Sequence, residues 1–181
     1  RRKVILYSGS LWKNDAGIEY LVQGFINAKR SEYELHLYGT GELVPWIEEI
    51  SKEYPNVKYM GCVTNSEMVK IQSEVMLLVN PRPSKEEFCK YSFPSKTIEY
   101  MASGTPVLMT RLPGVPSEYF DYVYTIADET SEGMSKTLGI VLSKEEKDLK
   151  EFGACAREFV KKKKRKKRQS ERVYEFVQQL N

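Results

Sequence analysis

Short apolar runs alternate with stretches of helical periodicity along most of this chain. The run at residues 34–38 alternates as a strand does, and the run at 75–79 is wholly apolar, as a strand buried on both faces should be. The stretches between the runs repeat apolar side chains at helical spacing. We expect strands at residues 3–8, 34–38, 57–60, 75–79, 105–109 and 122–126, and helices at 17–29, 44–52, 66–72, 95–102 and 131–142. This alternation predicts an α/β fold, a Rossmann-like doubly wound parallel sheet of about six strands with helices on both faces, and ligands beyond the carboxyl ends of the strands.

The last part of the chain predicts a helical tail. Residues 144–160 form one expected helix, and a further helical segment ends near residue 177. Between them lies the basic run KKKKRKKR, from Lys161 to Arg168. The net charge of the chain is +3 and the run alone carries +8, so the rest of the chain sums to −5.

A solvated helix face explains this basic run without any function. The functional alternative is peripheral contact with an anionic membrane leaflet, because each basic residue near such a surface adds attraction. Nucleic acid is not an expected partner, since no aromatic stacking surface accompanies the run.

Composition indicates one folded domain. Of 181 residues, 41% are hydrophobic and 12% aromatic, which excludes a disordered chain, and the longest apolar run is too short for a membrane span. Cys62, Cys89 and Cys155 are odd in number and form no CxxC pair, so neither a disulfide framework nor a zinc site is predicted. A cytoplasmic location is expected. The start at Arg1, without Met, suggests a piece of a longer protein.

The single histidine, His36, lies within an expected strand. Alternation points its side chain away from the face of Leu35 and Leu37, so a structural or surface role is expected. One histidine can form neither a His-based triad nor a His/Cys metal cluster. We therefore expect no metal site and no cofactor.

The stretch from Phe93 to Leu108 is the most informative, because a predicted helix opens there beside an apolar strand. Ser95 fits the N-cap of this helix, and Glu99 lies one turn inside it. A helix opening offers free N–H groups and the positive end of its dipole, both of which suit phosphate. A carboxylate at that place can accept hydrogen bonds from sugar hydroxyls. The pattern therefore indicates a nucleotide-sugar site.

Five landmarks, each containing glycine, follow one another along the chain. They are Ser8-Gly9-Ser10, Gly17 at a helix opening, Tyr38-Gly39-Thr40-Gly41-Glu42, the stretch from Asn56 to Gly61, and the stretch from Ala102 to Val107. In this order they resemble the retaining GT-B glycosyltransferases of group 1, family 4 of the usual classification. The resemblance implies that residues 1–181 form a single domain, the C-terminal donor-nucleotide half of a two-domain enzyme whose N-terminal domain is absent from this chain. It also implies that the last helix, with Val173, Phe176 and Val177, packs on that N-terminal domain.

By position, the resemblance places Glu99 at the second glutamate of the family's E-x7-E pattern, which accepts hydrogen bonds from the donor ribose. Tyr91 replaces the first glutamate and is the expected contact to the donor sugar, with Glu86 or Glu87 as alternatives. Lys96 is the basic group best placed to meet the diphosphate. This segment gives the donor-binding candidates Phe93, Pro94, Ser95, Lys96 and Glu99, and the catalytic candidates Lys96 and Tyr91.

The first loop departs from the family. The resemblance calls for an arginine and a lysine on the diphosphate, and the chain has Ser10 and Ala16 at those two positions. Lys13, between them, is the expected replacement, with an ordinary exposed lysine as the alternative. Gly9 and Ser10 stay among the donor-binding candidates.

Cys62 and Val63 match the place where the family seats the base of the nucleotide, although an ordinary loop capped by Thr64 or Asn65 explains the same residues. Gly39 is a further donor-binding candidate. With Gly41 it also forms a G-x-G pattern typical of dinucleotide sites, but Val44 stands where that fingerprint needs a third glycine.

The resemblance implies a bacterial, cytoplasmic hexosyltransferase that takes a UDP- or GDP-linked sugar and transfers it with retention to a glycan or lipid-linked acceptor in polysaccharide or glycoconjugate synthesis. A noncatalytic nucleotide-binding or assembly module is the alternative, favoured by Tyr91, Ser10 and Ala16. A dinucleotide-dependent oxidoreductase is a weaker third hypothesis.

Overall fold

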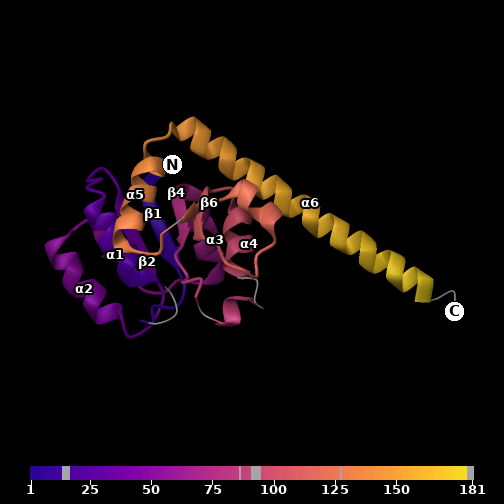
Figure 1. The fold of residues 1–181 in the computed structure, drawn as a ribbon, viewed down its shortest axis with the longest axis horizontal. Helices are drawn as coiled ribbons and strands as arrows, with labels where there is room; N and C mark the ends of the chain where they lie inside the picture. Colours follow the sequence, from indigo (N-terminus) through magenta and orange to yellow (C-terminus); the bar gives the residue numbers. More distant parts are fainter. Residues whose placement is uncertain (14–16, 86, 91–94, 127, 179–181) are drawn as a thin grey trace.

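A computed structural model describes residues 1–13, 17–85, 87–90, 95–126 and 128–178, with the backbone alone at residues 88, 90 and 164–178. Within them, six parallel strands form one sheet in the order β3-β2-β1-β4-β5-β6 (Figure 1). The strands are β1 Arg2–Ser8, β2 Glu34–Tyr38, β3 Val57–Tyr59, β4 Val75–Asn80, β5 Val107–Thr110 and β6 Tyr124–Ile126. Because the strand order changes direction between β1 and β4, the sheet is doubly wound, and the predicted fold class is confirmed.

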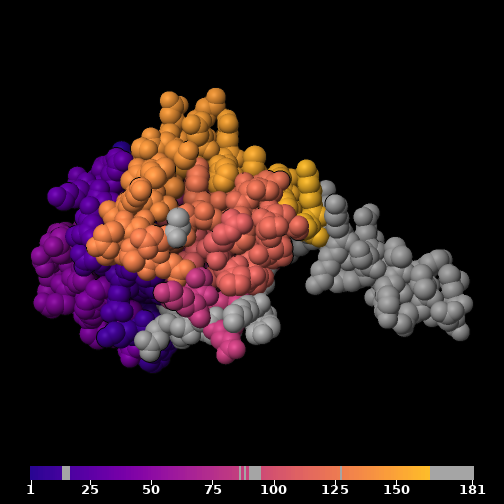
Figure 2. All heavy atoms as spheres, in the orientation of Figure 1, coloured from indigo at the N-terminus to yellow at the C-terminus, as the bar shows by residue number. Residues whose placement is uncertain are grey.

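Helices connect these strands and cover both faces of the sheet. They are α1 Ile18–Asn27, α2 Val44–Glu53, α3 Asn65–Glu74, α4 Ser95–Ser103, α5 Ser131–Leu142 and α6 Glu146–Gln178, with short 3-10 helices η1 Glu87–Lys90 and η2 Ser117–Tyr122. Helix α1 packs against α5, and α4 packs against α6. Figure 2 shows α5, in orange, beside the indigo first part of the chain.

The core consists of two apolar clusters, one on each face of the sheet. Helices α1, α2 and α5 close the first cluster, and α3, α4 and the first half of α6 close the second. Successive residues of β4 point to opposite clusters, as Leu77 and Leu78 do, and the whole strand is buried. A sheet packed on both faces holds its strand ends in fixed positions, which matters for the site below.

His36 belongs to this buried structure. Its side chain lies on the face opposite Leu35 and Leu37, as predicted, but only 6% of the residue is exposed, so the structural alternative is the correct one. Its Nε2 lies 2.7 Å from Glu34 Oε2, and Glu34 also pairs with Lys58. Burial lowers the pKa of His36, and the Glu34 carboxylate partly offsets that shift.

The end of the chain differs from its prediction. Residues 146–178 form one continuous helix, α6, instead of two helical segments around the basic run. Lysine and arginine are good helix formers and the run contains no glycine or proline, so nothing in it ends the helix. The first half of α6 packs on the domain through stacked aromatic rings. The ring centroids of Phe159 and Tyr122 are 4.4 Å apart, and those of Phe152 and Tyr124 are 4.5 Å apart. The second half extends beyond the sheet (Figure 1).

Two strands begin later than predicted. β5 begins at Val107 because the Thr105 N–H donates to Ser103 Oγ at 3.1 Å and Pro106 has no N–H to give to a ladder. β6 begins at Tyr124 because η2 occupies the residues before it. Among the described residues, no helix has both the length and the apolar character to cross a membrane.

Candidate functional site

The loops that follow β1, β2 and β3 are joined to one another at the carboxyl edge of the sheet. The Gly9 N–H donates to the Tyr38 carbonyl, and the Gly39 N–H donates to the Gly61 carbonyl, both at 2.9 Å. The Leu11 N–H donates to the Thr40 carbonyl, also at 2.9 Å. Backbone bonds of this kind fix the three loops as one surface, whatever side chains the loops carry.

Gly39 is the residue that allows this contact. Its φ is 137°, a value that favours glycine, and a Cβ built on it would overlap the carbonyl oxygen of Gly9. Tyr59 Oη donates to the Gly39 carbonyl at 2.9 Å and holds the loop from the other side. The glycine that the sequence suggested for a phosphate loop therefore brings two loop backbones together.

Helix α4 is fixed to the same edge by Tyr100, which is fully buried. Its hydroxyl accepts from the Ser8 N–H at 2.9 Å and lies 3.1 Å from the Ser8 carbonyl, to which it donates. Burial raises the pKa of Tyr100 to about 12, so the phenol is neutral at physiological pH and can donate. This contact sets the distance between the opening of α4 and the first loop.

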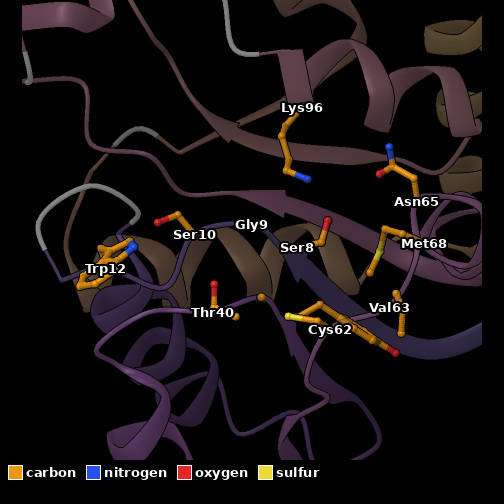
Figure 3. A pocket seen from close by; sticks show the side chains of 12 residues that line it. Ser8, Gly9, Ser10, Trp12, Thr40, Cys62, Val63, Asn65, Met68 and Lys96 are labelled. Atoms are coloured by element: carbon orange, nitrogen blue, oxygen red, sulfur yellow. The ribbon is translucent and has the colours of Figure 1, made fainter.

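A cavity of about 330 Å³ lies between the three loops and the openings of α3 and α4 (Figure 3). Its size is within the range of small-molecule sites. Lys96, in the first turn of α4, points its amine into this space, and a Cβ on Gly9 would lie 3.6 Å from Lys96 Cε. The lining consists of Ser8, Gly9, Ser10, Trp12, Tyr38, Gly39, Thr40, Cys62, Val63, Asn65, Met68 and Lys96.

This arrangement favours an anion. Helices α3 and α4 both open toward the cavity, but Thr64 and Glu67 form a capping box at the opening of α3. The positive potential of a helix opening therefore comes from α4. Lys96 adds a full positive charge at the same place. Val63 and Met68, at the end of the cavity opposite Trp12, provide apolar surface for a flat group (Figure 3).

Residues 2–143 match the family model described as glycosyl transferases group 1. The chain belongs to the group 1 glycosyltransferases. The resemblance stated from its glycine landmarks is therefore confirmed. No curated protein matches the chain.

Solved structures share the fold of this chain. The pneumococcal O-GlcNAc transferase GtfA in complex with UDP and GlcNAc is 18% identical, with a TM-score of 0.73 over 98% of this chain and 36% of that chain. Sucrose-phosphate synthase from Thermosynechococcus elongatus is 20% identical, with a TM-score of 0.76 over 98% of this chain and 46% of that chain. HepE from Anabaena in complex with UDP and glucose is 13% identical, with a TM-score of 0.69 over 89% of this chain and 44% of that chain. The chain thus spans less than half the length of these three proteins.

The cavity brings together about half of the candidates predicted from the sequence. Gly9, Ser10, Gly39, Cys62, Val63 and Lys96 line it, and Ser95, Lys13 and Glu99 do not. Ser95 is the first residue of α4 instead of its N-cap. Lys13 is exposed, and its backbone N–H donates to Glu42 Oε1 at 3.0 Å. Tyr91, Phe93 and Pro94, and the departure at Ala16, lie outside the described residues.

Glu99 lies one turn further along α4 than Lys96 and is half-buried. Its Oε1 accepts from Gln72 Nε2 of α3 at 2.6 Å. Glu99, the residue predicted to bind the ribose, is therefore held between α3 and α4, one turn behind the cavity lining and not in the lining itself.

Sequence reasoning missed half of the residues that line this cavity. Ser8, Tyr38 and Thr40 directly flank the glycines that were identified, so a wider window around each glycine would have included them. Asn65, Met68 and Trp12 gave no such signal: the first two lie in the opening turns of α3, and Trp12 is a half-exposed aromatic in a loop.

Proposed function

We propose that this domain binds the nucleoside diphosphate of a sugar donor in the cavity between the first loop and the opening of α4. The observation that carries the proposal is the position of Lys96, whose amine reaches over Gly9 into a space bounded by backbone loops. A lysine and the opening of α4 at one cavity provide the positive charge that a diphosphate needs.

The proposed reaction is transfer of a hexosyl group, with retention, to a glycan or lipid-linked acceptor. The family supports sugar transfer, and the GtfA and HepE structures contain UDP together with GlcNAc or glucose. We propose that the acceptor site belongs to an N-terminal domain outside this chain, since this chain covers 36% to 46% of those relatives.

In this proposal the chain acts mainly through electrostatics. As the glycosyl bond breaks, negative charge develops on the leaving diphosphate, and donors that already point there lower the barrier. Lys96 and the N–H groups of the first turn of α4 are those donors. Cys62 and Val63 lie at the nucleoside end, and Glu99, behind the lining, takes the ribose hydroxyls.

The proposal is tested by calorimetric titration of the chain with UDP, GDP, ADP and NAD, repeated on Glu99→Ala. We expect one nucleoside diphosphate to bind and to bind at least about tenfold more weakly to Glu99→Ala, because a hydrogen bond to a charged group contributes about 1.5–3 kcal/mol. Preferential binding of NAD, or equal binding by both proteins, would contradict the assigned site.

A noncatalytic nucleotide-binding module is the second candidate, and Ser10 favours it. Ser10 lines the cavity at the position where the family resemblance implies an arginine, so one expected cation is replaced by a neutral side chain. Release of nucleoside diphosphate from a sugar donor by the full-length protein separates the two functions, since a binding module would show none.

We also propose that the run from Lys161 to Arg168 attracts α6 to an anionic membrane surface, where a lipid-linked acceptor would lie. Within this run, Lys163 pairs with Glu118 of η2, so the domain itself neutralises part of the charge. Sedimentation with vesicles should show more binding when the vesicles contain anionic lipid, and less binding at higher salt. Equal binding to neutral vesicles would refute this contact.

A further inference from the structure

Gln72 and Glu99 form a side-chain pair directly behind the cavity. Met68 of α3 and Lys96 of α4 line the cavity, and Gln72 and Glu99 lie one turn further along the same two helices. Gln72 Nε2 donates to Glu99 Oε1 at 2.6 Å, a short distance for a hydrogen bond of this kind. Among the described residues, Gln72 is the one hydrogen-bond donor to Glu99.

The charge of Glu99 fixes the orientation of the Gln72 amide. An ionised carboxylate can only accept, so the amide must present its nitrogen to Glu99 and its oxygen elsewhere. That oxygen, Gln72 Oε1, is buried and has no hydrogen-bond partner among the described residues. Gln72 itself is 1% exposed.

A buried, unpaired amide oxygen destabilises a protein, and an apolar side chain of similar volume would avoid this cost. The backbone at Gln72 does not depend on the amide either, because its carbonyl is held by Thr105 Oγ1 at 2.6 Å. The fold therefore gains little from glutamine here. What the amide provides is a fixed position for the Glu99 carboxylate.

We propose that Gln72 is a positioning residue that orients Glu99 toward the ribose hydroxyls of the bound nucleotide. With Oε1 held by Gln72, the other carboxylate oxygen is left to accept from the ligand. This inference rests on the proposed function, since it needs a ribonucleotide in the cavity. It predicts that Gln72, although absent from the cavity lining, controls discrimination between ribose and deoxyribose.

The experiment compares the binding of UDP and GDP with that of 2′-deoxy-UDP and 2′-deoxy-GDP to the chain and to Gln72→Met. We expect the unchanged chain to prefer the ribonucleotide by roughly tenfold to hundredfold, as a hydrogen bond to a carboxylate implies. Gln72→Met should lose most of this preference with only a small change in melting temperature, because loss of the bond to Glu99 is offset by removal of the buried, unpaired Oε1. Gln72→Leu is a second apolar replacement.

Two controls separate positioning from packing. Thr105→Val removes the adjacent buried hydrogen bond and should lower stability while keeping the ribose preference. In a Glu99→Ala background, Gln72→Met should have no further effect on ribose preference, because the residue it acts through is gone.

Undiminished ribose preference in Gln72→Met, or equal weakening of ribo- and deoxyribonucleotides, would overturn the positioning role alone. Failure of the unchanged chain to bind any of the four nucleotides would overturn the proposed function and this inference with it.

Discussion

The two sides of the nucleotide cavity are built differently. On the side of β1, β2 and β3, backbone hydrogen bonds join the loops, and Gly39 permits their close approach. On the side of α4, the geometry depends on side chains that span the structure: Tyr100 holds Ser8, Lys96 reaches over Gly9, and Glu99 meets α3.

This difference separates shape from charge. A backbone frame keeps its geometry when its side chains change, so the first loop can lose a cation at Ser10 and still line the cavity. The α4 side contributes the charged groups, Lys96 and Glu99, and a single substitution removes either of them. We therefore expect changes in the frame, or in Tyr100 that anchors α4 to it, to lower stability, and changes in the charged side chains of α4 to lower affinity.

The largest effect should come from Gly39→Ala, because the new Cβ would overlap the Gly9 carbonyl at a φ of 137°. Strain and overpacking together should lower the free energy of unfolding by about 4 kcal/mol. Urea denaturation measures this. The matched control is Gly139→Ala in α5, where a Cβ meets no atom within 4 Å, and it should stabilise by up to about 1 kcal/mol. Equal changes in the free energy of unfolding for Gly39→Ala and Gly139→Ala would show that stability does not depend on the close contact between the loops.

Tyr100→Phe should have the next largest effect, since it leaves the buried Ser8 N–H and carbonyl without their partner. We expect a loss of about 1–3 kcal/mol in urea denaturation. Because burial raises the pKa of Tyr100 from 10.0 to about 12, its contribution is complete below pH 10 and is lost as the pH rises to about 12. Tyr100→Phe should therefore show a shallower loss of stability over that range. If stability fell equally steeply with pH in Tyr100→Phe and in the unchanged chain, the raised pKa of a buried Tyr100 would be contradicted.

Ser10→Arg places a positive charge on the side of the cavity formed by the loops after β1, β2 and β3, where backbone groups now predominate. A guanidinium can meet phosphate through two hydrogen bonds, so the affinity for UDP or GDP should rise by roughly tenfold, with little change in stability. Ser10→Gln, which is polar and uncharged, should give no such gain in the same calorimetric titration. A gain in both variants would point to size instead of charge.

The smallest effect concerns His36, outside the site. Burial lowers its pKa below the ordinary 6.5, so the unfolded chain takes up the proton first, and stability should fall as the pH drops through about 6.5. The effect is small because Glu34 partly offsets the shift. An NMR titration of the single imidazole and denaturation of His36→Gln check it. A pKa above 6.5 would reverse the sign.

Local patterns in the sequence were sufficient for the sheet and for the glycine loops. Strand β4 and helix α5 have local signals, an apolar run and a helical repeat, and both were found close to their observed bounds. Six cavity residues followed from the family resemblance, which rests on the glycine landmarks and on the helix opening near Lys96. These features depend on residues near one another in the chain.

The parts that were missed depend on distant residues. Gln72 and Glu99 are 27 positions apart, and Tyr100 and Ser8 are 92 apart, so no local pattern connects them. The Lys13 N–H donates to Glu42, which belongs to another loop. The continuous helix α6 was missed because a run of like charges was treated as an interruption, although its residues favour helix.

The most direct test of the account is calorimetric titration of UDP and GDP into the chain, Lys96→Ala and Lys70→Ala. Lys70 is an exposed lysine on α3 outside the cavity lining, so Lys70→Ala removes the same charge from the molecule without touching the site. The account predicts roughly tenfold to hundredfold weaker binding by Lys96→Ala and unchanged binding by Lys70→Ala. Equal affinities in all three proteins would contradict the assignment of this cavity to the diphosphate.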